Sequence, residues 1–141
     1  MTRIRGIIPD PYLIGGGVHI YKTGAKLSVH SDFNYHPLFK LDRRLNLLYF
    51  VNENWQESWN GKLELWDKDV KECKKSISPI ANRCVIFSTT STSFHGLPKP
   101  INCPPEISRN SFALYYYSNG RPKDEKNDPH PTLWKKTTND M

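Results

Sequence analysis

The feature that most constrains this 141-residue chain is a succession of short strand-forming runs separated by turn residues. The runs lie at residues 18–22, 26–31, 44–51, 62–66, 76–79, 83–88, 93–97 and 109–118. Helical periodicity is nearly absent, and most of the 11 Pro and 8 Gly residues lie between the runs. Seven or eight short strands at this spacing predict an all-β domain, which means a β-sandwich, a jelly roll or a barrel.

Two of these runs carry more specific signals. Residues 18–31 read as a hairpin, because two alternating segments flank the turn Thr23-Gly24-Ala25. Residues 44–51 are apolar on both faces, which is typical of a buried central strand. We therefore expect residues 44–51 to lie in the middle of a sheet.

The two ends of the chain differ from the middle. Residues 1–17 form a lead-in segment without periodicity, and residues 18–118 form the predicted domain. Residues 119–141 are polar and interrupted by Pro, so we expect a C-terminal tail that lies on the surface, pinned by Trp134. No repeat or second domain is expected.

Composition excludes several classes of protein. With 37% apolar residues the chain can build one core, but no apolar run approaches the roughly 20 residues of a membrane helix. The first residues contain no apolar stretch typical of a signal peptide. Cys73, Cys84 and Cys103 form no CxxC pair, which disfavours a disulfide scaffold or structural zinc site. These features favour a reducing compartment, and we expect a cytoplasmic protein.

The net charge of +6 decides little about partners. Arg43-Arg44, Lys74-Lys75 and Lys135-Lys136 are separated pairs, whereas a nucleic-acid surface usually concentrates basic residues on one stripe. Nucleic acid is therefore not favoured as a partner, and an anionic small molecule suits this charge equally well.

The first chemical signal is His30-Ser31-Asp32 at the end of a predicted strand. Side chains at positions i and i+2 of a strand share a face, so the imidazole and the carboxylate converge. His95, from a distant strand, would complete a facial set of two His and one carboxylate, which leaves three adjacent coordination positions open on Fe(II). The HxD pattern alone is weak, and a surface strand with an unrelated His and Asp explains it as well.

The second signal is Arg109-Asn110-Ser111, in which Arg109 and Ser111 share one strand face. A guanidinium offers two parallel hydrogen bonds to a carboxylate, and a neighbouring hydroxyl can donate a third. An α-keto diacid would need two binding groups: a metal at its keto-acid end and an Arg at its far carboxylate. HxD, a later His and RxS in this order are much more specific than any one of them.

With these motifs the chain resembles the Fe(II)- and 2-oxoglutarate-dependent oxygenases, specifically the prolyl 4-hydroxylase-like branch. The resemblance covers roughly residues 12–118. It rests on Ile20-Tyr21, His30-Ser31-Asp32, residues 48–55, residues 61–66, residues 79–87, His95-Gly96 and Arg109-Asn110-Ser111.

The resemblance implies a double-stranded β-helix, a jelly-roll variant of the cupin type. It implies Fe(II), 2-oxoglutarate and O2 as cofactor and cosubstrates, with ascorbate as an optional reductant. By position, the iron ligands would be His30, Asp32 and His95, with no catalytic residue beyond them. Arg109 and Ser111 would bind the distal carboxylate of 2-oxoglutarate, and Tyr21 would contact the cosubstrate near the metal.

Three departures from the family pattern matter. Arg109 stands where many prolyl hydroxylases have Lys, so prolyl specificity is not implied. Phe50 stands where some members have a Tyr that contacts the cosubstrate, and Asn46 on the same strand face is expected to compensate. The helices that brace the larger sheet in most members are expected to be short or missing here. A sheet face left uncovered in this way would be covered either by residues 1–14 and 119–141 or by a second chain, and we expect self-association into a homo-oligomer.

The sequence leaves the substrate open. The expected reaction is hydroxylation of a C–H bond on a prolyl or other amino-acid residue. A small anionic metabolite is the alternative, which His36 near the pocket mouth would suit. Two other classes stay open: a non-catalytic jelly-roll binding module, and a zinc- or manganese-dependent enzyme of the cupin type.

Overall fold

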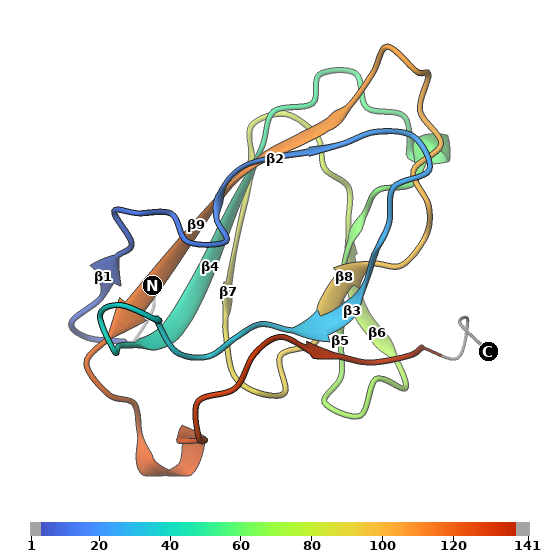
Figure 1. The fold of residues 1–141 in the computed structure, drawn as a ribbon. Helices are drawn as coiled ribbons and strands as arrows, with labels where there is room; N and C mark the ends of the chain where they lie inside the picture. The colour runs from blue at the N-terminus through green and yellow to red at the C-terminus, as the bar shows by residue number, and fades with distance from the viewer. Residues whose placement is uncertain (1–3, 138–141) are drawn as a thin grey trace.

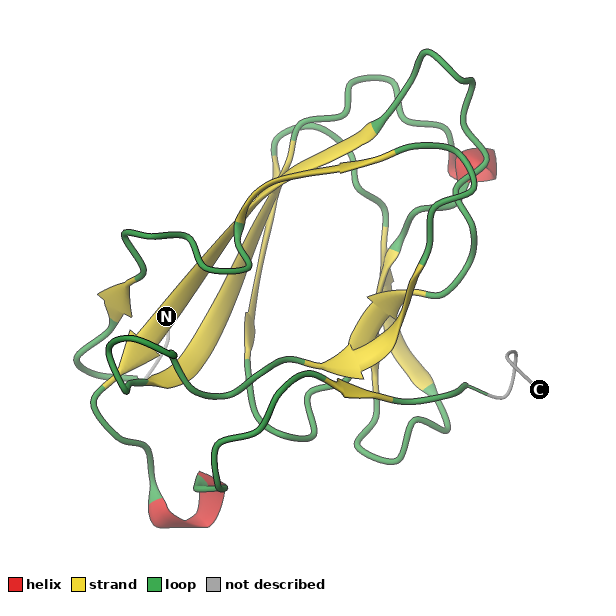
Figure 2. Cartoon of the chain, in the orientation of Figure 1, coloured by secondary structure: helices red, strands yellow, loops and turns green. Residues whose placement is uncertain are grey.

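The computed structural model describes residues 4–137 and consists of strands and loops (Figures 1 and 2). The strands are β1 (Ile8–Pro9), β2 (Gly17–Tyr21), β3 (Leu27–Ser31), β4 (Asp42–Phe50), β5 (Leu63–Trp66), β6 (Cys73–Ile77), β7 (Arg83–Ser88), β8 (His95–Leu97), β9 (Arg109–Ser118) and β10 (Leu133–Trp134). Within residues 4–137 the helical structure is limited to two 3-10 turns, η1 (Glu57–Trp59) and η2 (Lys123–Glu125). Neither turn is long and apolar enough to cross a membrane.

The strands form two antiparallel five-stranded sheets that face each other (Figure 1). The first sheet has the order β1-β9-β4-β7, with β2 also paired to β9, and the second has the order β10-β3-β8-β5-β6. Apart from the β5–β6 pair, consecutive strands from β2 to β9 cross from one sheet to the other. This alternation is the predicted double-stranded β-helix.

The expected hairpin at residues 18–31 is wrong. β2 pairs with β9, whereas β3 pairs with β8 and β10, so the two strands belong to different sheets. The turn between them is held by a distant loop, because Gly24 N donates to Ile101 O at 2.7 Å and Ile101 N donates to Ala25 O at 2.9 Å. An alternating pattern beside a turn identifies the strands without identifying their partners.

The expected strand at residues 76–79 lies a little earlier in the chain, at Cys73–Ile77. It is an edge strand of the second sheet, so it tolerates the exposed Lys74 and Lys75 that obscure its pattern. It also ends before Pro79, which lacks the N–H needed for pairing. The other predicted strands coincide with observed strands within two residues.

The two ends of the chain add short strands to both sheets. β1 pairs with β9, so part of the lead-in segment belongs to the first sheet. β10 pairs with β3, so part of the tail belongs to the second sheet, and the tail does not merely lie on the surface. Residues 1–3 and 138–141 of these two predicted segments lie outside the described residues.

The space between the sheets is only partly apolar. The described residues also contain two buried apolar clusters, one of Val29, Val70 and Phe94 and the other of Trp55, Ile101 and Cys103. The first sheet also directs polar side chains inward, and Arg43, Asn46 and Arg109 are each at most 2% exposed. Because buried polar groups are costly unless they are bonded, this polar part of the interior is where a functional site is expected.

Candidate metal centre

His30, Asp32 and His95 form a compact group of potential metal ligands. His30 lies on β3 and His95 on β8, and the two residues are direct cross-strand partners. Asp32 follows β3 by one residue, and the ligand atoms of all three lie within 4.8 Å of one another. The sheet thus brings together the residues that the HxD motif and the later His predicted.

Both imidazoles present the same nitrogen to this group. Nδ1 of His30 lies 2.8 Å from the Ser28 carbonyl oxygen, and Nδ1 of His95 lies 3.1 Å from that of Ser93. A carbonyl oxygen only accepts, so each Nδ1 carries the proton and each Nε2 keeps a lone pair. Burial lowers the pKa of His95 to about 4, so its ring is neutral at physiological pH. Each ring therefore directs its Nε2 toward the group of ligand candidates.

The Asp32 carboxylate is ionised in spite of its burial. Desolvation alone would raise its pKa, but the contact with His30, the charge of Arg43 and the hydrogen bond from Asn46 together hold the pKa well below its usual range. The donor set is therefore two imidazole nitrogens and one anionic oxygen that line one cavity. This set suits Fe(II) with three positions left open, and the side chains present fit such an ion.

Arg43 contacts the candidate ligand Asp32, and the sequence did not indicate this contact. Its NH2 lies 3.0 Å from Asp32 Oδ2, and Asn46 Nδ2 donates to the same oxygen at 2.7 Å. Asn46 Oδ1 in turn accepts from Arg43 at 2.8 and 3.1 Å. With two donors on Oδ2, Oδ1 remains the less committed oxygen for a metal. The position of Arg43 beside the predicted central strand was the available signal, but the Arg43-Arg44 pair resembled a solvated surface.

A shift in strand register explains why both arginines of this pair are buried. Between Arg43 and Leu45 the pairing of β4 with β9 slips by one residue, so Arg44 is the extra residue. Arg43 contacts Asp32, and its guanidinium packs on the rings of Tyr115 at 3.5 Å and Phe33 at 4.4 Å. Arg44 instead pairs with Glu125 of the C-terminal tail.

Arg109 and Ser111 lie at the start of β9, and both are 2% exposed. Arg109 Nε donates to the Gly61 carbonyl oxygen at 2.7 Å, but its Nη2 is buried without a hydrogen-bond partner among the described residues. Burial lowers the pKa of Arg109 to about 10, which leaves it charged at physiological pH. A buried cation with an unpaired donor is what a carboxylate-binding site requires before its ligand arrives.

Gly61 allows Arg109 to take this position. A Cβ atom at Gly61 would lie 3.1 Å from Arg109 Cδ and 3.1 Å from the Trp55 ring, and φ there is +73°. A larger residue would therefore displace the guanidinium or the ring.

One cavity collects all seven residues predicted for the site. It is lined by His30, Asp32, His95, Arg109, Ser111, Tyr21 and Asn46, together with His19, Tyr115 and the apolar Leu27, Leu48, Leu63 and Leu97. Tyr21 is the cross-strand partner of Arg109, and burial raises its pKa.

His36 does not belong to this cavity, so its expected place near the pocket mouth is wrong. Its side chain is fully buried, and its Nε2 lies 3.3 Å from Asp10 Oδ1. Its Nδ1 accepts hydrogen bonds from the backbone N–H groups of Leu38 and Phe39. Sequence could not reveal this role, because the partner lies in the lead-in segment.

Comparison with known proteins agrees with this geometry. The model of the 2OG-Fe(II) oxygenase superfamily matches residues 16–117. A curated relative, the mouse prolyl 3-hydroxylase OGFOD1, is 29% identical over 79 residues, which is 53% of this chain but only 14% of that protein.

Two solved structures are similar to this chain at 19% sequence identity. A prolyl 4-hydroxylase from Phytophthora capsici has a TM-score of 0.53 over 72% of this chain and 31% of its own. A prolyl 4-hydroxylase from Pseudomonas putida has a TM-score of 0.49 over 79% of this chain and 52% of its own. Because the family model spans most of the double-stranded β-helix that carries the His30, Asp32 and His95 group, this chain belongs to the 2OG-Fe(II) oxygenase superfamily.

Proposed function

We propose that this chain is an Fe(II)- and 2-oxoglutarate-dependent dioxygenase that hydroxylates a C–H bond. The observation that carries the proposal is one cavity that contains both a three-ligand metal group and a buried, unpaired guanidinium donor. A metal site alone would suit a zinc or manganese enzyme equally well. The Arg109–Ser111 pair favours a dicarboxylate cosubstrate.

Each ligand has a defined task in this proposal. His30 and His95 would bind Fe(II) through Nε2, and Asp32 would bind it through a carboxylate oxygen while offsetting part of its charge. The bound metal, with 2-oxoglutarate and O2, supplies the oxidant that attacks the substrate C–H bond. The chain itself contributes orientation, since the Ser28 and Ser93 carbonyls fix both rings.

Arg109 and Ser111 would bind the distal carboxylate of 2-oxoglutarate. The NH2 group of Arg109 then gains the partner that it lacks, which offsets the cost of its burial. Tyr21 lies beside Arg109 and is proposed to contact the cosubstrate. Asn46 already donates to Asp32, but Nδ2 carries a second hydrogen, which keeps the expected contact with the cosubstrate available.

The remaining wall of the cavity is suited to keeping water away from the oxidant. Leu27, Leu48, Leu63 and Leu97 line it, and Leu63 and Leu97 are almost fully buried. An apolar wall limits loss of the oxidant to side reactions with water.

For the substrate we propose a peptidyl or free amino acid, with proline as the first choice. The support is that the mouse relative is a prolyl 3-hydroxylase, although this chain spans only 14% of its length. The anionic-metabolite alternative loses the part of its argument that rested on His36, because that ring is buried against Asp10. It becomes an outcome of the test.

The proposed location is the cytoplasm. Cys73, Cys84 and Cys103 are all free thiols, a state typical of a reducing compartment.

The test is mass spectrometry of a proline-rich peptide mixture incubated with the protein, Fe(II), 2-oxoglutarate, ascorbate and O2. We expect a product that has gained one oxygen atom on Pro, formed together with succinate. His30→Ala and His95→Ala should both abolish succinate formation while keeping the β-sheet circular dichroism spectrum. Succinate formation stimulated only by small acids would overturn the peptide assignment, and undiminished turnover in both His variants would overturn the metal site.

A further inference from the structure

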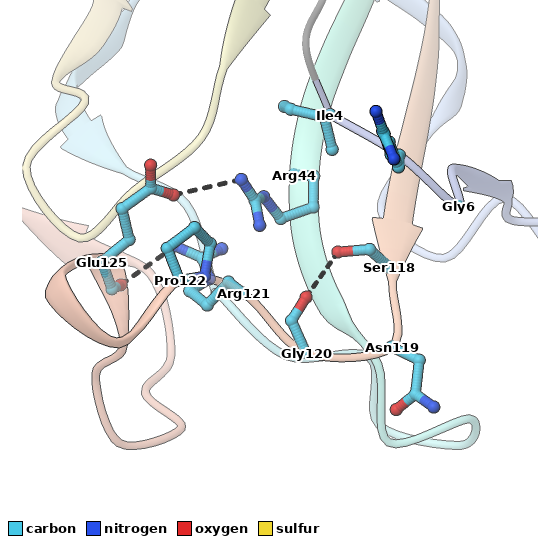
Figure 3. Close-up of a pocket in the computed structure, with 10 residues that line it drawn as sticks. Ile4, Gly6, Arg44, Ser118, Asn119, Gly120, Arg121, Pro122 and Glu125 are labelled. Carbon is cyan, nitrogen blue, oxygen red and sulfur yellow. Dashed lines mark hydrogen bonds and ion pairs between the residues drawn. The ribbon is translucent and has the colours of Figure 1, made fainter.

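The C-terminal segment, residues 119–137, is fastened to the domain along its length. Arg44 of β4 pairs with Glu125 at 3.1 Å (Figure 3). Arg121 lies 3.4 Å from Asp42. These contacts line a hollow of about 670 Å³ that contains none of the metal-ligand candidates. Since the buried arginines there already have carboxylate partners, the hollow is best explained as the attachment point of this segment.

Further along, the segment is held by side chains next to the metal motif. Asn34 Nδ2 donates to the Asp128 carbonyl oxygen at 2.9 Å, and His130 N donates to Asn34 Oδ1 at 2.8 Å. His130 Nε2 lies 2.8 Å from the Ser91 hydroxyl, close in sequence to His95. The segment is therefore bound to the loops that flank both halves of the ligand group.

β10 then completes the second sheet beside the metal ligand His30. In the order β10-β3-β8-β5-β6, β3 would be an edge strand without β10 (Figure 1). Lys135 N also donates to the Val29 carbonyl oxygen at 2.8 Å, which extends the contact beyond β10. An unpaired edge exposes backbone donors and acceptors to solvent, so β10 shields the strand that carries the ligand.

Trp134 contacts the ligand itself. It is the cross-strand partner of His30, so the two side chains share a face, and their ring centroids are 4.8 Å apart. His95, on the neighbouring strand β8, also contacts this ring, and the ring centroids of His30 and His95 are 4.5 Å apart. His30 is only 5% exposed, whereas Trp134 is 58% exposed, so the indole forms an outer layer beside a buried ligand.

We infer that the C-terminal segment is part of the metal centre and that Trp134 is a positioning residue for His30. The hydrogen bond from Nδ1 to Ser28 fixes one edge of the imidazole, and contact with the indole limits rotation of the ring about that bond. Nε2 then stays directed toward Asp32 and His95. This inference rests on the proposed metal centre.

A purely structural role for β10 makes a different prediction. In that case the backbone pairing of β10 matters, and Leu133, the neighbour of Trp134 on the same strand, would be as important as Trp134. Leu133→Ala is therefore the matched control, because it removes an exposed side chain from β10 and leaves the ring contact with His30 intact.

The experiment is a Co(II) titration of the full chain, followed by equilibrium dialysis and by tryptophan fluorescence. Co(II) quenches nearby indoles, so the emission of the unsubstituted protein should fall as the site fills. Trp134→Phe should lose a share of this decrease in emission, whereas Trp59→Phe should keep it, because Trp59 packs against Trp55 instead.

Trp134→Ala should weaken Co(II) binding by about 10-fold, at the low end of the range for residues that orient metal ligands. Phe at this position should restore most of the affinity, and Leu133→Ala should bind as the unsubstituted protein does.

Two results would overturn the inference. One is a Trp134→Ala variant that is folded and binds Co(II) with unchanged affinity. The other is a Trp134→Phe variant that keeps the complete fluorescence change. Absence of Co(II) binding by the unsubstituted protein is a separate result that contradicts the metal centre itself.

Discussion

Arg43 and Asp32 form a buried pair of charges at the proposed metal centre. Arg43 is fully buried, and its only carboxylate partner among the described residues is Asp32, which is itself a proposed metal ligand. Removing one member of a buried pair leaves the other uncompensated. The orientation of Asp32, and with it the metal affinity, should therefore depend on Arg43.

The change Arg43→Met tests this dependence. It keeps an apolar stem between Phe33 and Tyr115 but removes both hydrogen bonds to Asn46 and the contact with Asp32. We expect a loss of about 3–5 kcal/mol in unfolding free energy and a fall of about 10–100-fold in metal affinity. Arg44→Met is the matched control and should lower stability while leaving metal affinity unchanged. Equal metal affinities for the two variants would contradict the role of Arg43.

Arg109 should determine the affinity for 2-oxoglutarate. Arg109→Ala removes a buried, charged hydrogen-bond donor, so the dissociation constant for 2-oxoglutarate should rise by about 10–100-fold, or roughly 1.4–2.8 kcal/mol. Arg109→Lys should keep part of the affinity, because the Lys ammonium supplies a positive charge but cannot form two parallel hydrogen bonds to one carboxylate. Isothermal titration in the presence of a redox-inert divalent metal measures this directly. Normal binding by the Ala variant would place the carboxylate site elsewhere.

At the scale of elements, the lead-in segment is anchored by one buried carboxylate. Asp10 accepts hydrogen bonds from the backbone N–H groups of Tyr12 and Ile14 and lies against His36 in the loop before β4. Burial alone would raise the pKa of Asp10, but these partners lower it below its ordinary value of 3.8. The folded protein therefore favours the ionised form.

A pH dependence of stability follows from Asp10. Because the folded pKa is lowered, this stabilisation is fully present above about pH 4, the unfolded value, and is lost as pH falls through the folded pKa. Asp10→Asn should reduce the unfolding free energy by about 1–3 kcal/mol at pH 7. The difference from the unsubstituted protein should shrink in acid. Urea unfolding between pH 7 and pH 3 measures both, and a difference that stays constant with pH would refute the role of the charge.

Sequence patterns predicted the strands better than their partners. Apolar, strand-forming runs located the long strands β4 and β9, because both strands bury much of their length. The β2–β3 hairpin was wrong because pairing across a jelly roll depends on distant loops, such as the one at Ile101. No sequence pattern indicated β10, because a two-residue strand held by backbone hydrogen bonds requires no particular side chains.

At the scale of the whole molecule, the outer face of the first sheet is apolar and open. A cross-strand row runs Val18–Phe112–Tyr49–Cys84, and the next row runs Leu114–Leu47–Ile86. Val18, Phe112 and Ile86 are 60%, 43% and 54% exposed. These rows contain no charged side chain, so two copies can stack through them without burying an unpaired charge. We propose that a second copy of the chain covers this face.

Light scattering after size-exclusion chromatography tests this proposal. We expect a dimer that Ile86→Glu converts to a monomer, and Cys84 should react with alkylating reagents only in that monomer. Leu38→Glu is the control, because Leu38 is equally exposed but lies in the loop before β4. A monomer with a fully reactive Cys84 at micromolar concentrations would exclude self-association through this face.

The candidate site was predictable where its residues share strand faces. HxD and RxS each place two side chains on one face, and the fold brings both pairs into one cavity. Arg43 and Trp134 were not predictable as part of the metal centre. The first reaches it through a register shift and the second through a tail that returns to β3. Such contacts depend on tertiary placement that local patterns do not encode.

The central claim is that one cavity binds Fe(II) through His30, Asp32 and His95 and 2-oxoglutarate through Arg109. Visible absorption of the protein, mixed without oxygen with Fe(II) and then 2-oxoglutarate, tests it most directly. The account predicts a charge-transfer band that needs both additions, disappears in Asp32→Ala and requires more 2-oxoglutarate in Arg109→Ala. No band in the unsubstituted protein, or an undiminished band in Asp32→Ala, would contradict it.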